Sequence, residues 1–373
     1  MDFYKKLNTH EKQTFGLHIG YSVLEGVIAG IIALNEFVFV KSLFGSGYQL
    51  SVLFQFSMTV FILLVFFNEF LKRIKNKRSL LRYAAIITRL PLALVFFFPR
   101  EASQLTGNSI YHIIFLALFL VYYLAHPIIF PTINLFLKNA YRHENFGKLY
   151  SYATTLNKIV MMVTTFAYGL MLDANHYAFV YVFPVMAVLG IASVFLLSLI
   201  QAPPPEVVDH SLSTWKSIKA SALNMYSILK TNRQFLHFQI GFMLYGMGFM
   251  GSVTVIVLFF DKGLGLNYSS IAFYRNAYNI LAIASLPFFG KLLGIIDPRR
   301  FASISFFSMM LFILSLILAV YFPNHFQVTG ITVYYALLLY VLFHSVFAAT
   351  MALLWSIGSA YFAPGNEAGQ YQS

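Results

Sequence analysis

The chain alternates long apolar stretches with shorter polar ones from one end to the other. Ten stretches are mainly apolar over roughly twenty residues or more, the length a helix needs to cross about 30 Å of hydrocarbon. They are 14–43, 48–70, 79–98, 109–137, 150–172, 177–200, 236–260, 268–290, 302–322 and 329–357. Barrel strands alternate apolar with polar residues, and an isolated strand leaves its backbone unpaired in lipid. The pattern therefore predicts an all-α integral membrane protein with about ten transmembrane helices.

One long polar stretch, Gln201 to Gln234, separates the first six apolar segments from the last four. It opens with three prolines and then carries apolar residues at helical spacing: Leu212, Trp215, Ile218, Ala222, Met225 and Ile228. This is typical of a cytoplasmic linker whose amphipathic helix lies on the membrane surface, and a partly disordered tether is the alternative. The predicted organisation is a six-helix half over 1–200, a linker over 201–235 and a four-helix half over 236–373.

A faint internal repeat connects the two groups of apolar segments. Five residues in or beside polar loops recur 222 positions later, namely Phe66, Phe67, Leu71, Ile74 and Arg78 as Phe288, Phe289, Leu293, Ile296 and Arg300. Gly147 and Ser151 recur as Gly369 and Ser373 at the same offset, and Ala140-Tyr141 recurs as Ala360-Tyr361 with a slip of two. A shared offset in separate loops indicates a duplicated bundle with parallel halves, an arrangement typical of transporters whose substrate site lies between the halves.

Composition places the chain in a bilayer and excludes several classes of function. It is 59% hydrophobic and 10% charged, with a mean hydropathy of +0.73, far from soluble globular composition. The absence of cysteine excludes disulfides, thiolate metal sites and a cysteine nucleophile. No Walker loop, zinc pattern, nucleophile elbow or Rossmann fingerprint occurs, so we expect neither an enzyme nor a protein that needs a cofactor or metal.

The net charge is +12, and the distribution of the basic residues along the chain is explained by membrane topology. Lys and Arg gather in alternate loops, and the opposite loops hold only Lys41, Arg100 and Lys262. Because positively charged loops resist translocation, the N-terminus is predicted to be cytoplasmic. The basic residues are spread between spans, so no nucleic-acid partner is expected, and the predicted location is a bacterial cytoplasmic (inner) membrane.

The loop from Gly290 to Phe301 resembles the cytoplasmic signature loop of the major facilitator superfamily (MFS). That pattern has a Gly, a Leu two later, an Asp four after the Gly and an Arg-rich end. Gly290, Leu292, Arg299 and Arg300 fit, while Gly294 occupies the Asp position and Asp297 comes three residues late. The loop from Arg142 to Tyr150 is similar to the equivalent turn of the first half.

The resemblance covers the whole chain and implies an MFS-like bundle. It also implies that Gly290, Asp297, Arg299 and Arg300 form a gating loop. A twelve-helix member has two helices beyond those predicted here, so we expect a C-terminally truncated member of the family.

Ionisable residues within membrane spans are costly and are therefore candidates for function. Glu25 is a candidate proton carrier, and a fixed ion pair with Lys158 or Arg89 is the alternative. The family's helix roles imply that Lys158 and Arg275 face a central cavity, where they would hold an anionic group, with snorkelling or internal pairing as the alternative. Arg89 lies on a scaffold helix in the family and is expected to pair structurally.

Neutral polar residues complete the predicted site. His126 and His344 could titrate near neutral pH and serve proton coupling, although a lone membrane histidine is more often a packing residue. Asn157 and Asn279 could donate hydrogen bonds to a solute, and polar contacts between helices explain them equally well.

These features favour a secondary transporter that works by alternating access. The predicted cargo is a small solute, anionic or zwitterionic because Lys158 and Arg275 outnumber Glu25, and the candidate coupling ions are protons or Na⁺. The other expected partner is the lipid bilayer, and no oligomer is expected. The alternatives are a non-transporting membrane protein or inactive fragment of the same fold, and an integral-membrane enzyme, for which no cluster of Asp, Glu and His is seen.

Overall fold

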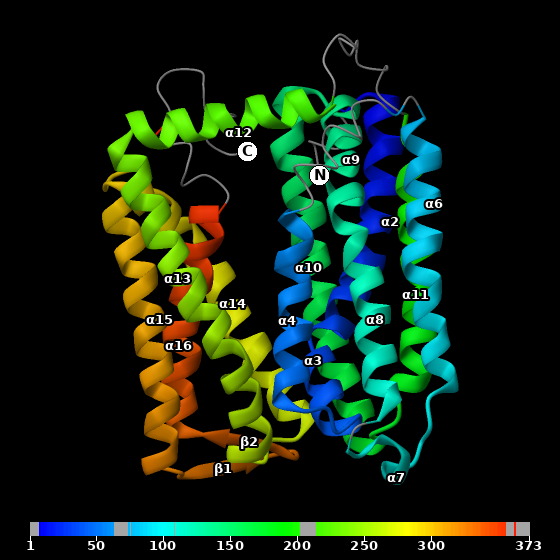
Figure 1. The fold of residues 1–373 in the computed structure, drawn as a ribbon, viewed down its shortest axis with the longest axis vertical. Coiled ribbons are helices and arrows are strands. Elements are labelled where there is room, and N and C mark those ends of the chain that lie inside the picture. Colours follow the sequence, from blue (N-terminus) through cyan, green and yellow to red (C-terminus); the bar gives the residue numbers. More distant parts are fainter. Residues whose placement is uncertain are drawn as a thin grey trace. The chain divides into compact units, whose positions relative to one another are not determined.

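The computed structural model describes residues 7–62, 74, 76–107, 109–201, 214–355 and 362, mostly as long helices (Figure 1). Several residues of the predicted repeat and linker lie outside these ranges: Phe66, Phe67, Leu71, Ala360, Tyr361, Gly369, Ser373, Leu212 and the prolines at 203–205. The chain divides into two compact units. Unit 1 comprises Met1–Ile218 with Ile256–Gly263, and unit 2 comprises Lys219–Val255 with Leu264–Ser373.

The helices of unit 1 follow the six apolar segments of the first half. They are α2 (Thr9–Ile32), α3 (Asn35–Phe37), the π-helix η1 (Val38–Ser42), α4 (Gly47–Ile62), α6 (Lys77–Arg89), the 3-10 helix η2 (Leu90–Phe97), α7 (Ala102–Leu105), α8 (Ile110–Leu124), α9 (His126–Ala140), α10 (His143–Ala174) and α11 (Phe179–Ser198). The π-helix η3 (Phe259–Gly263) also belongs to this unit. Prolines explain two irregularities, because Pro91 follows the change from α6 to η2 and Pro127 follows the break between α8 and α9.

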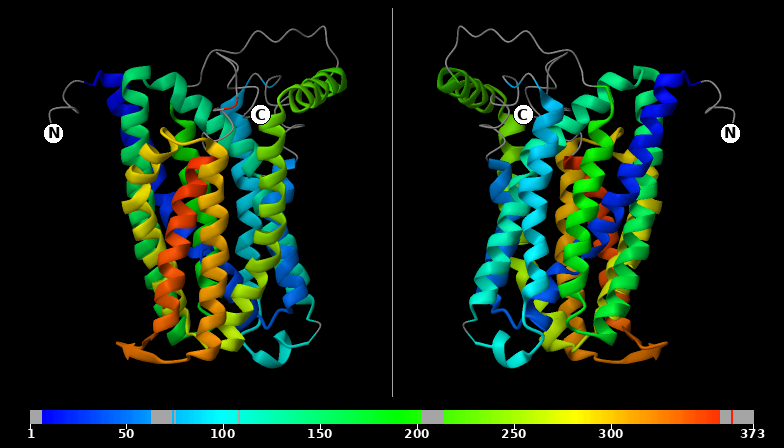
Figure 2. Two further views of the ribbon diagram at one scale, coloured as in Figure 1. Left: turned by 90° about the vertical axis from the view of Figure 1, so that its left-hand side faces the viewer. Right: turned by 90° about the vertical axis from the view of Figure 1, so that its right-hand side faces the viewer.

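The helices of unit 2 follow the remaining four segments. They are α13 (Arg233–Leu258, of which residues 233–255 belong here), α14 (Tyr268–Leu293), α15 (Pro298–Tyr321) and α16 (Tyr335–Leu353). Before α13, helix α12 (Thr214–Thr231, of which residues 219–231 belong here) occupies the stretch where an amphipathic helix was predicted, and it runs across the end of α13 rather than along it (Figures 1 and 2). Within unit 2, α16 packs against both α14 and α15.

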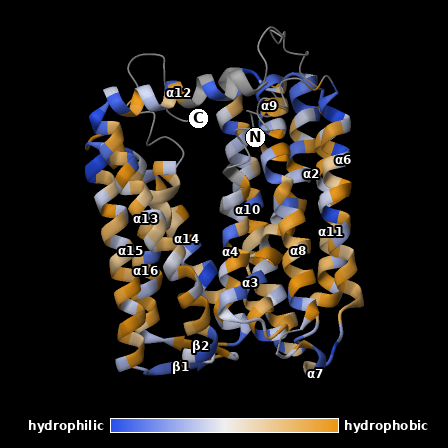
Figure 3. Cartoon of the chain, in the orientation of Figure 1, coloured by the Kyte–Doolittle hydropathy of each residue, from blue (hydrophilic) through white to orange (hydrophobic). Residues whose placement is uncertain are grey.

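Eight helices or continuous helical runs among the described residues are long and apolar enough to cross a membrane. Figure 3 shows apolar residues along the middle of the helices and polar residues toward their ends. Of the ten predicted spans, 48–70 and 268–290 are not among the eight. The described part of α4 has 16 residues, and α14 has 26 but is not apolar enough. The helical membrane class is confirmed, whereas the count of ten is not.

The predicted start of the last span, 329–357, is wrong. Residues 325–334 form an antiparallel hairpin of β1 (His325–Val328) and β2 (Ile331–Tyr334), and α16 begins only at Tyr335. Thr329 and Gly330 make the two-residue turn with φ of 49° and 83°, the positive values that a tight hairpin turn requires. The hairpin pairs its own backbone groups, and its strand residues include the β-branched Val328, Ile331, Thr332 and Val333.

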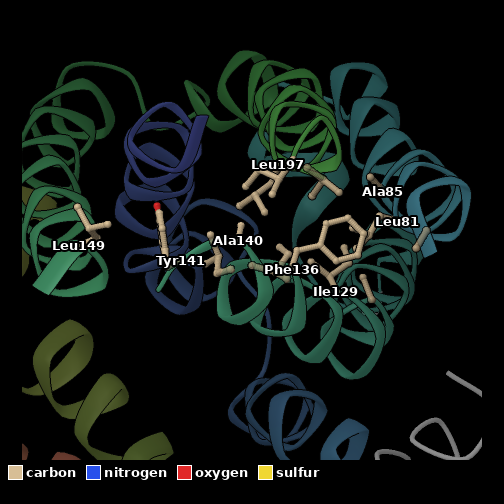
Figure 4. Packing of buried hydrophobic residues seen from close by; sticks show 14 of the residues in the cluster. Leu81, Ala85, Ile129, Phe136, Ala140, Tyr141, Leu149 and Leu197 are labelled. Atoms are coloured by element: carbon tan, nitrogen blue, oxygen red, sulfur yellow. The ribbon is translucent and has the colours of Figure 1, made fainter. Parts of the chain in front are cut away.

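Buried apolar side chains of α6, α9 and α11 form a core cluster in unit 1 (Figure 4). Phe136 lies between Leu81 and Ala85 of α6 and Leu197 of α11, and none of the four is appreciably exposed. Lipid is as apolar as these side chains, so close packing rather than removal from water stabilises such contacts. The cluster fixes α6 and α11, which carry two residues of the site described below.

Two glycines bring α2 and α10 into backbone contact. A Cβ atom at Gly26 would lie 2.7 Å from the Asn157 carbonyl oxygen, and one at Gly30 would lie 2.7 Å from that of Met161. Thr165 Oγ1 also donates to the Gly30 carbonyl at 3.2 Å. Small residues four apart let membrane helices approach this closely. This contact sets the height of Glu25 on α2 relative to Lys158 on α10.

Candidate functional site

The central polar feature of unit 1 is an ion pair between α2 and α6. Arg89 Nη1 lies 3.2 Å from Glu25 Oε1, with side-chain exposures of 2% for Arg89 and 15% for Glu25. Ser193 of α11 donates its hydroxyl to the same Glu25 oxygen at 2.5 Å and lies 2.9 Å from the Gly190 carbonyl. Of the two partners considered for Glu25, the structure shows Arg89 and not Lys158.

The Arg89 side chain occupies space that other helices leave open for it. A Cβ atom at Gly190 would lie 2.7 Å from Arg89 Nη1 and 2.8 Å from its Cδ, so a larger residue there would require the Arg89 side chain to shift. The Tyr122 ring of α8 lies with its centroid 5.5 Å from the guanidinium carbon, within the range of a cation–π contact. Arg89 Nε is buried without a hydrogen-bond partner among the described residues. Glu25 therefore supplies the compensating negative charge.

Lys158 and Asn157 are neighbours on α10 with different surroundings. Asn157 Nδ2 donates to the Ser22 carbonyl of α2 at 2.9 Å, which matches the alternative of a polar contact between helices. Lys158 is half-buried, and within the described ranges it forms no ion pair and no hydrogen bond. Lys158 is therefore a membrane-embedded cation that these residues leave uncompensated.

His126 begins α9, directly after the break that follows α8. Its ring lies among aromatic neighbours, with centroid distances of 5.4 Å to Tyr122, 5.2 Å to Tyr123 and 4.7 Å to Phe130. Tyr122 thus contacts both His126 and Arg89, so His126 belongs to the surroundings of the ion pair.

In unit 2, Arg275 and Asn279 lie one turn apart on α14. Asn279 Nδ2 donates to the Arg275 carbonyl at 2.7 Å, a contact within the helix. The Arg275 side chain is half-buried. The structure therefore places both predicted residues on one helix of unit 2, while Glu25, His126, Asn157 and Lys158 are in unit 1.

His344 of α16 lies between two aromatic rings. Its ring is stacked on Tyr278 at 4.0 Å with an interplanar angle of 7° and on Phe312 at 4.7 Å with an angle of 16°. His344 Nδ1 is buried without a hydrogen-bond partner in the described part of the chain. The packing explains the position of the ring and leaves one nitrogen free to accept or donate.

The predicted gating loop connects α14 to α15. α14 ends at Leu293, Gly290 lies in its last turn, and Asp297 caps the start of α15 by accepting from Arg299 N at 2.8 Å. Both Asp297 carboxylate oxygens also accept from the Arg299 guanidinium, at 3.0 and 2.8 Å. Hydrogen bonding to Arg299 lowers the pKa of Asp297 to about 2. The Asp297–Arg299 ion pair is thus internal to this loop, and Arg300 is exposed.

The loop that begins α10 is tied to the start of α2. Glu11, 1% exposed, accepts from Arg142 N at 3.1 Å and from Asn145 Nδ2 at 3.0 Å. Glu11 also forms a capping box with Asn8. This contact involves the turn that the sequence singled out in the first half.

Sequence reasoning missed four contributors to these contacts. They are Ser193, Gly190, Gly26 and Gly30. The spacing of Gly26 and Gly30 is a recognisable signal for close helix packing. Nothing in the linear pattern connects Ser193 or Gly190 to Arg89, because their proximity arises only from the packing of α6 against α11.

Comparisons with solved structures show the same fold at low sequence identity. A bacterial homologue of the human lysosomal transporter Spinster, in an inward-facing and unoccupied conformation, matches with a TM-score of 0.62 and 13% identity, covering 98% of this chain and 78% of that one. The nucleoside transporter NupG matches with a TM-score of 0.62 and 15% identity, covering 98% and 86%. A D-xylose–proton symporter matches with a TM-score of 0.55 and 13% identity, covering 96% and 84%.

Sequence comparison identifies the family directly. No curated protein matches the chain. The family described as Major Facilitator Superfamily matches residues 14–373, nearly the whole length, and the membrane-spanning helices agree with it. The chain is therefore an integral membrane protein that belongs to the Major Facilitator Superfamily of transporters.

Proposed function

We propose that this protein is a proton-coupled secondary transporter of a small anionic or zwitterionic solute, working by alternating access between halves at 1–200 and 236–373. The observation that carries the proposal is the buried Glu25–Arg89 pair, with Nη1 3.2 Å from Oε1. Family membership supports transport, and the solved neighbours include a protein named as a proton symporter. The fold neighbours support no particular solute.

Proton coupling follows from the asymmetry of the pair. Glu25 is the more exposed partner, at 15% against 2% for Arg89, so a proton from water reaches the Glu25 carboxylate while Arg89 stays shielded from water. Protonation of Glu25 leaves the Arg89 charge buried without its counterion, which costs several kcal/mol unless the surroundings change. A conformational change that rehydrates Arg89 is therefore favoured when Glu25 is protonated. This difference between two protonation states is what coupling requires.

Lys158 is the proposed solute contact in unit 1. As an uncompensated cation in a membrane helix, it favours an anionic partner, and a solute carboxylate would supply one. Arg275, Asn279 and His126 remain proposed contributors. Asn157 is proposed as a positioning residue, because its amide already bonds to Ser22. Gly290, Asp297, Arg299 and Arg300 are proposed as the gating loop, and the N-terminus is proposed to be cytoplasmic in a bacterial inner membrane.

Coupling is tested with the full chain in proteoliposomes that contain a trapped pH-sensitive dye. Monocarboxylates, amino acids and sugar phosphates are added one by one, and acidification of the lumen on addition reports proton-coupled uptake. Glu25→Gln should abolish acidification while leaving downhill entry of the labelled solute. Glu36→Gln, near the outer end of the same span, is the matched control. Unchanged acidification in Glu25→Gln would contradict the coupling proposal.

The charge preference is tested with the solute found in that screen. Lys158→Gln should raise KM for an anionic solute much more than it lowers kcat, because a ground-state contact is lost. Lys158→Arg should restore much of the affinity, and Lys138→Gln serves as an exposed control. Equal KM values for Lys158→Gln and the unmodified chain would remove Lys158 from the solute site.

A further inference from the structure

The outer ends of α2 and α13 carry a second, local copy of the repeat. The continuous helical runs Thr9–Ser42 and Arg233–Gly263 each end in a five-residue π-helical turn, η1 after α3 in the first and η3 after α13 in the second. Three residues recur 221 positions later, with Phe39, Lys41 and Leu43 answered by Phe260, Lys262 and Leu264. The backbone repeats as well, because Phe44 and Gly265, at the same offset, have φ of 58° and 59°. Duplication has thus left two equivalent lysines on two equivalent turns, and π-helical turns often occur at functional sites.

The two lysines differ in their partners. Lys41 Nζ lies 2.9 Å from Asp261 Oδ1, and both side chains are largely buried. The residue equivalent to Asp261 in the first copy is Val40, which carries no charge and cannot accept a hydrogen bond. The reciprocal pair for Lys262 therefore does not exist. Lys262 forms no ion pair or hydrogen bond within the part of the chain that the structure describes.

A pocket of about 430 Å³ lies at these turns, entirely within unit 1. Its charged and polar lining comprises Lys41, Ser42, His176, Tyr177, Asp261 and Lys262. The two lysines and one aspartate give the pocket one uncompensated positive charge. The Tyr177 side chain is half-buried, and its hydroxyl has no hydrogen-bond partner among the described residues. The exposed Lys262 and the half-buried Tyr177 therefore line the same cavity, and neither side chain has a hydrogen-bond partner among the described residues.

We propose that this outer pocket is a binding site for a small carboxylate, separate from the site around Glu25. Lys262 supplies the charge that attracts the anion, and the Tyr177 hydroxyl donates a hydrogen bond to it. The Lys41–Asp261 pair fixes the two π-helical turns against each other and holds the pocket open. A single carboxylate matches the single uncompensated charge. The site would collect anionic solute at the outer face, and its occupancy does not depend on proton coupling.

The test is protection of Lys262 from an amine-reactive reagent in the purified full chain, with peptide mass spectrometry as the readout. Acetate and succinate are titrated from about 0.1 to 100 mM, a range that brackets the millimolar affinity expected for a solute held by few contacts. Chloride maintains constant ionic strength, and inorganic phosphate is a separate arm. At a carboxylate concentration about twice Kd, modification of Lys262 should be about threefold slower by mass action. Lys138, exposed and remote in sequence, is the control lysine.

Variants separate a bound ligand from salt screening. Tyr177→Phe should reduce the protection of Lys262, and Glu25→Gln should leave it unchanged, so the result is independent of the proposed transport cycle. Failure of acetate and succinate to protect Lys262 would overturn the proposal. Equal protection of Lys262 and Lys138 would also overturn it, because that result indicates charge screening by salt. Equal protection by phosphate and by carboxylates would overturn it as well, because that result indicates a lysine that does not select among anions. Full protection in Tyr177→Phe would also overturn the assigned geometry.

Discussion

The Glu25–Arg89 pair makes a quantitative prediction about stability. Arg89→Met removes the cation and leaves a carboxylate that is 15% exposed, whereas Glu25→Gln leaves an unpaired guanidinium that is 2% exposed. Breaking a buried pair from one side costs about 3–5 kcal/mol. Unit charges about 4 Å apart interact by about 4 kcal/mol at an effective dielectric constant of about 20. We therefore expect the double variant Glu25→Gln/Arg89→Met to be less destabilised than the sum of the single variants, with a coupling energy of about 2–4 kcal/mol.

The assay is equilibrium unfolding of the full chain in mixed micelles of detergent and denaturing detergent, followed by circular dichroism. The exposed pair Asp297–Arg299 is the internal control, because its side chains are 36% and 43% exposed. A double-mutant cycle at that pair should give less than about 1 kcal/mol. The reasoning is refuted if the coupling energy of Glu25 with Arg89 is no larger than that of the control pair. That outcome would mean that water reaches Arg89 in spite of its burial.

Three further predictions follow from local geometry. Gly26→Ala should destabilise the bundle by about 1–3 kcal/mol, because the new Cβ would lie 2.7 Å from a backbone oxygen. Gly16→Ala is the control, because its Cβ would meet open space, and it should be neutral or stabilising in the same unfolding assay. The pKa of Asp297 in the folded protein is lowered to about 2. Its contribution to stability is therefore present above the ordinary aspartate pKa and is lost as pH falls from about 4 to 2. The stability of Asp297→Asn should differ from that of the parent at pH 6 and converge with it near pH 2. Gly330→Val should loosen the hairpin, because φ of 83° is unfavourable for a β-branched residue, and hydrogen exchange at 325–334 should increase while exchange in α16 is unchanged.

The helices were predictable because, within lipid, an apolar run of this length satisfies its backbone hydrogen bonds by forming an α-helix. α11 (Phe179–Ser198) falls within the predicted 177–200, and α15 (Pro298–Tyr321) begins four residues before its predicted start because Asp297 caps it there. The hairpin was missed because its residues are apolar enough to extend the following span. Its signal is local, a Thr329-Gly330 turn between β-branched residues.

The site was predictable only in part. The cost of charge in lipid singled out Glu25, Arg89 and Lys158 as candidate residues from the sequence alone. The sequence does not decide whether Arg89 or Lys158 pairs with Glu25, because it does not show how each helix is rotated about its own axis. The choice follows from Gly190, whose missing side chain makes room for Arg89 beside α11, and from the backbone contact at Gly26, which sets how α10 and its Lys158 pass α2. These are relations between helices, and they appear only when the helices are packed.

The Glu25–Arg89 pair contributes little to the net stability of the bundle, and its more important effect is to make the protein respond to protonation. Replacing both members of a buried pair by uncharged residues of similar volume is often neutral or stabilising, so packing alone does not require these charges. A carboxylate that loses its charge on protonation changes the balance of buried charge by one unit, which Gln and Met at the same positions cannot do. The double variant Glu25→Gln/Arg89→Met should therefore keep the helical content of the fold, while solute entry in proteoliposomes becomes insensitive to an imposed pH gradient. Persistence of pH-driven accumulation in this folded variant would place the coupling group elsewhere, with His126 and His344 as the next residues to replace.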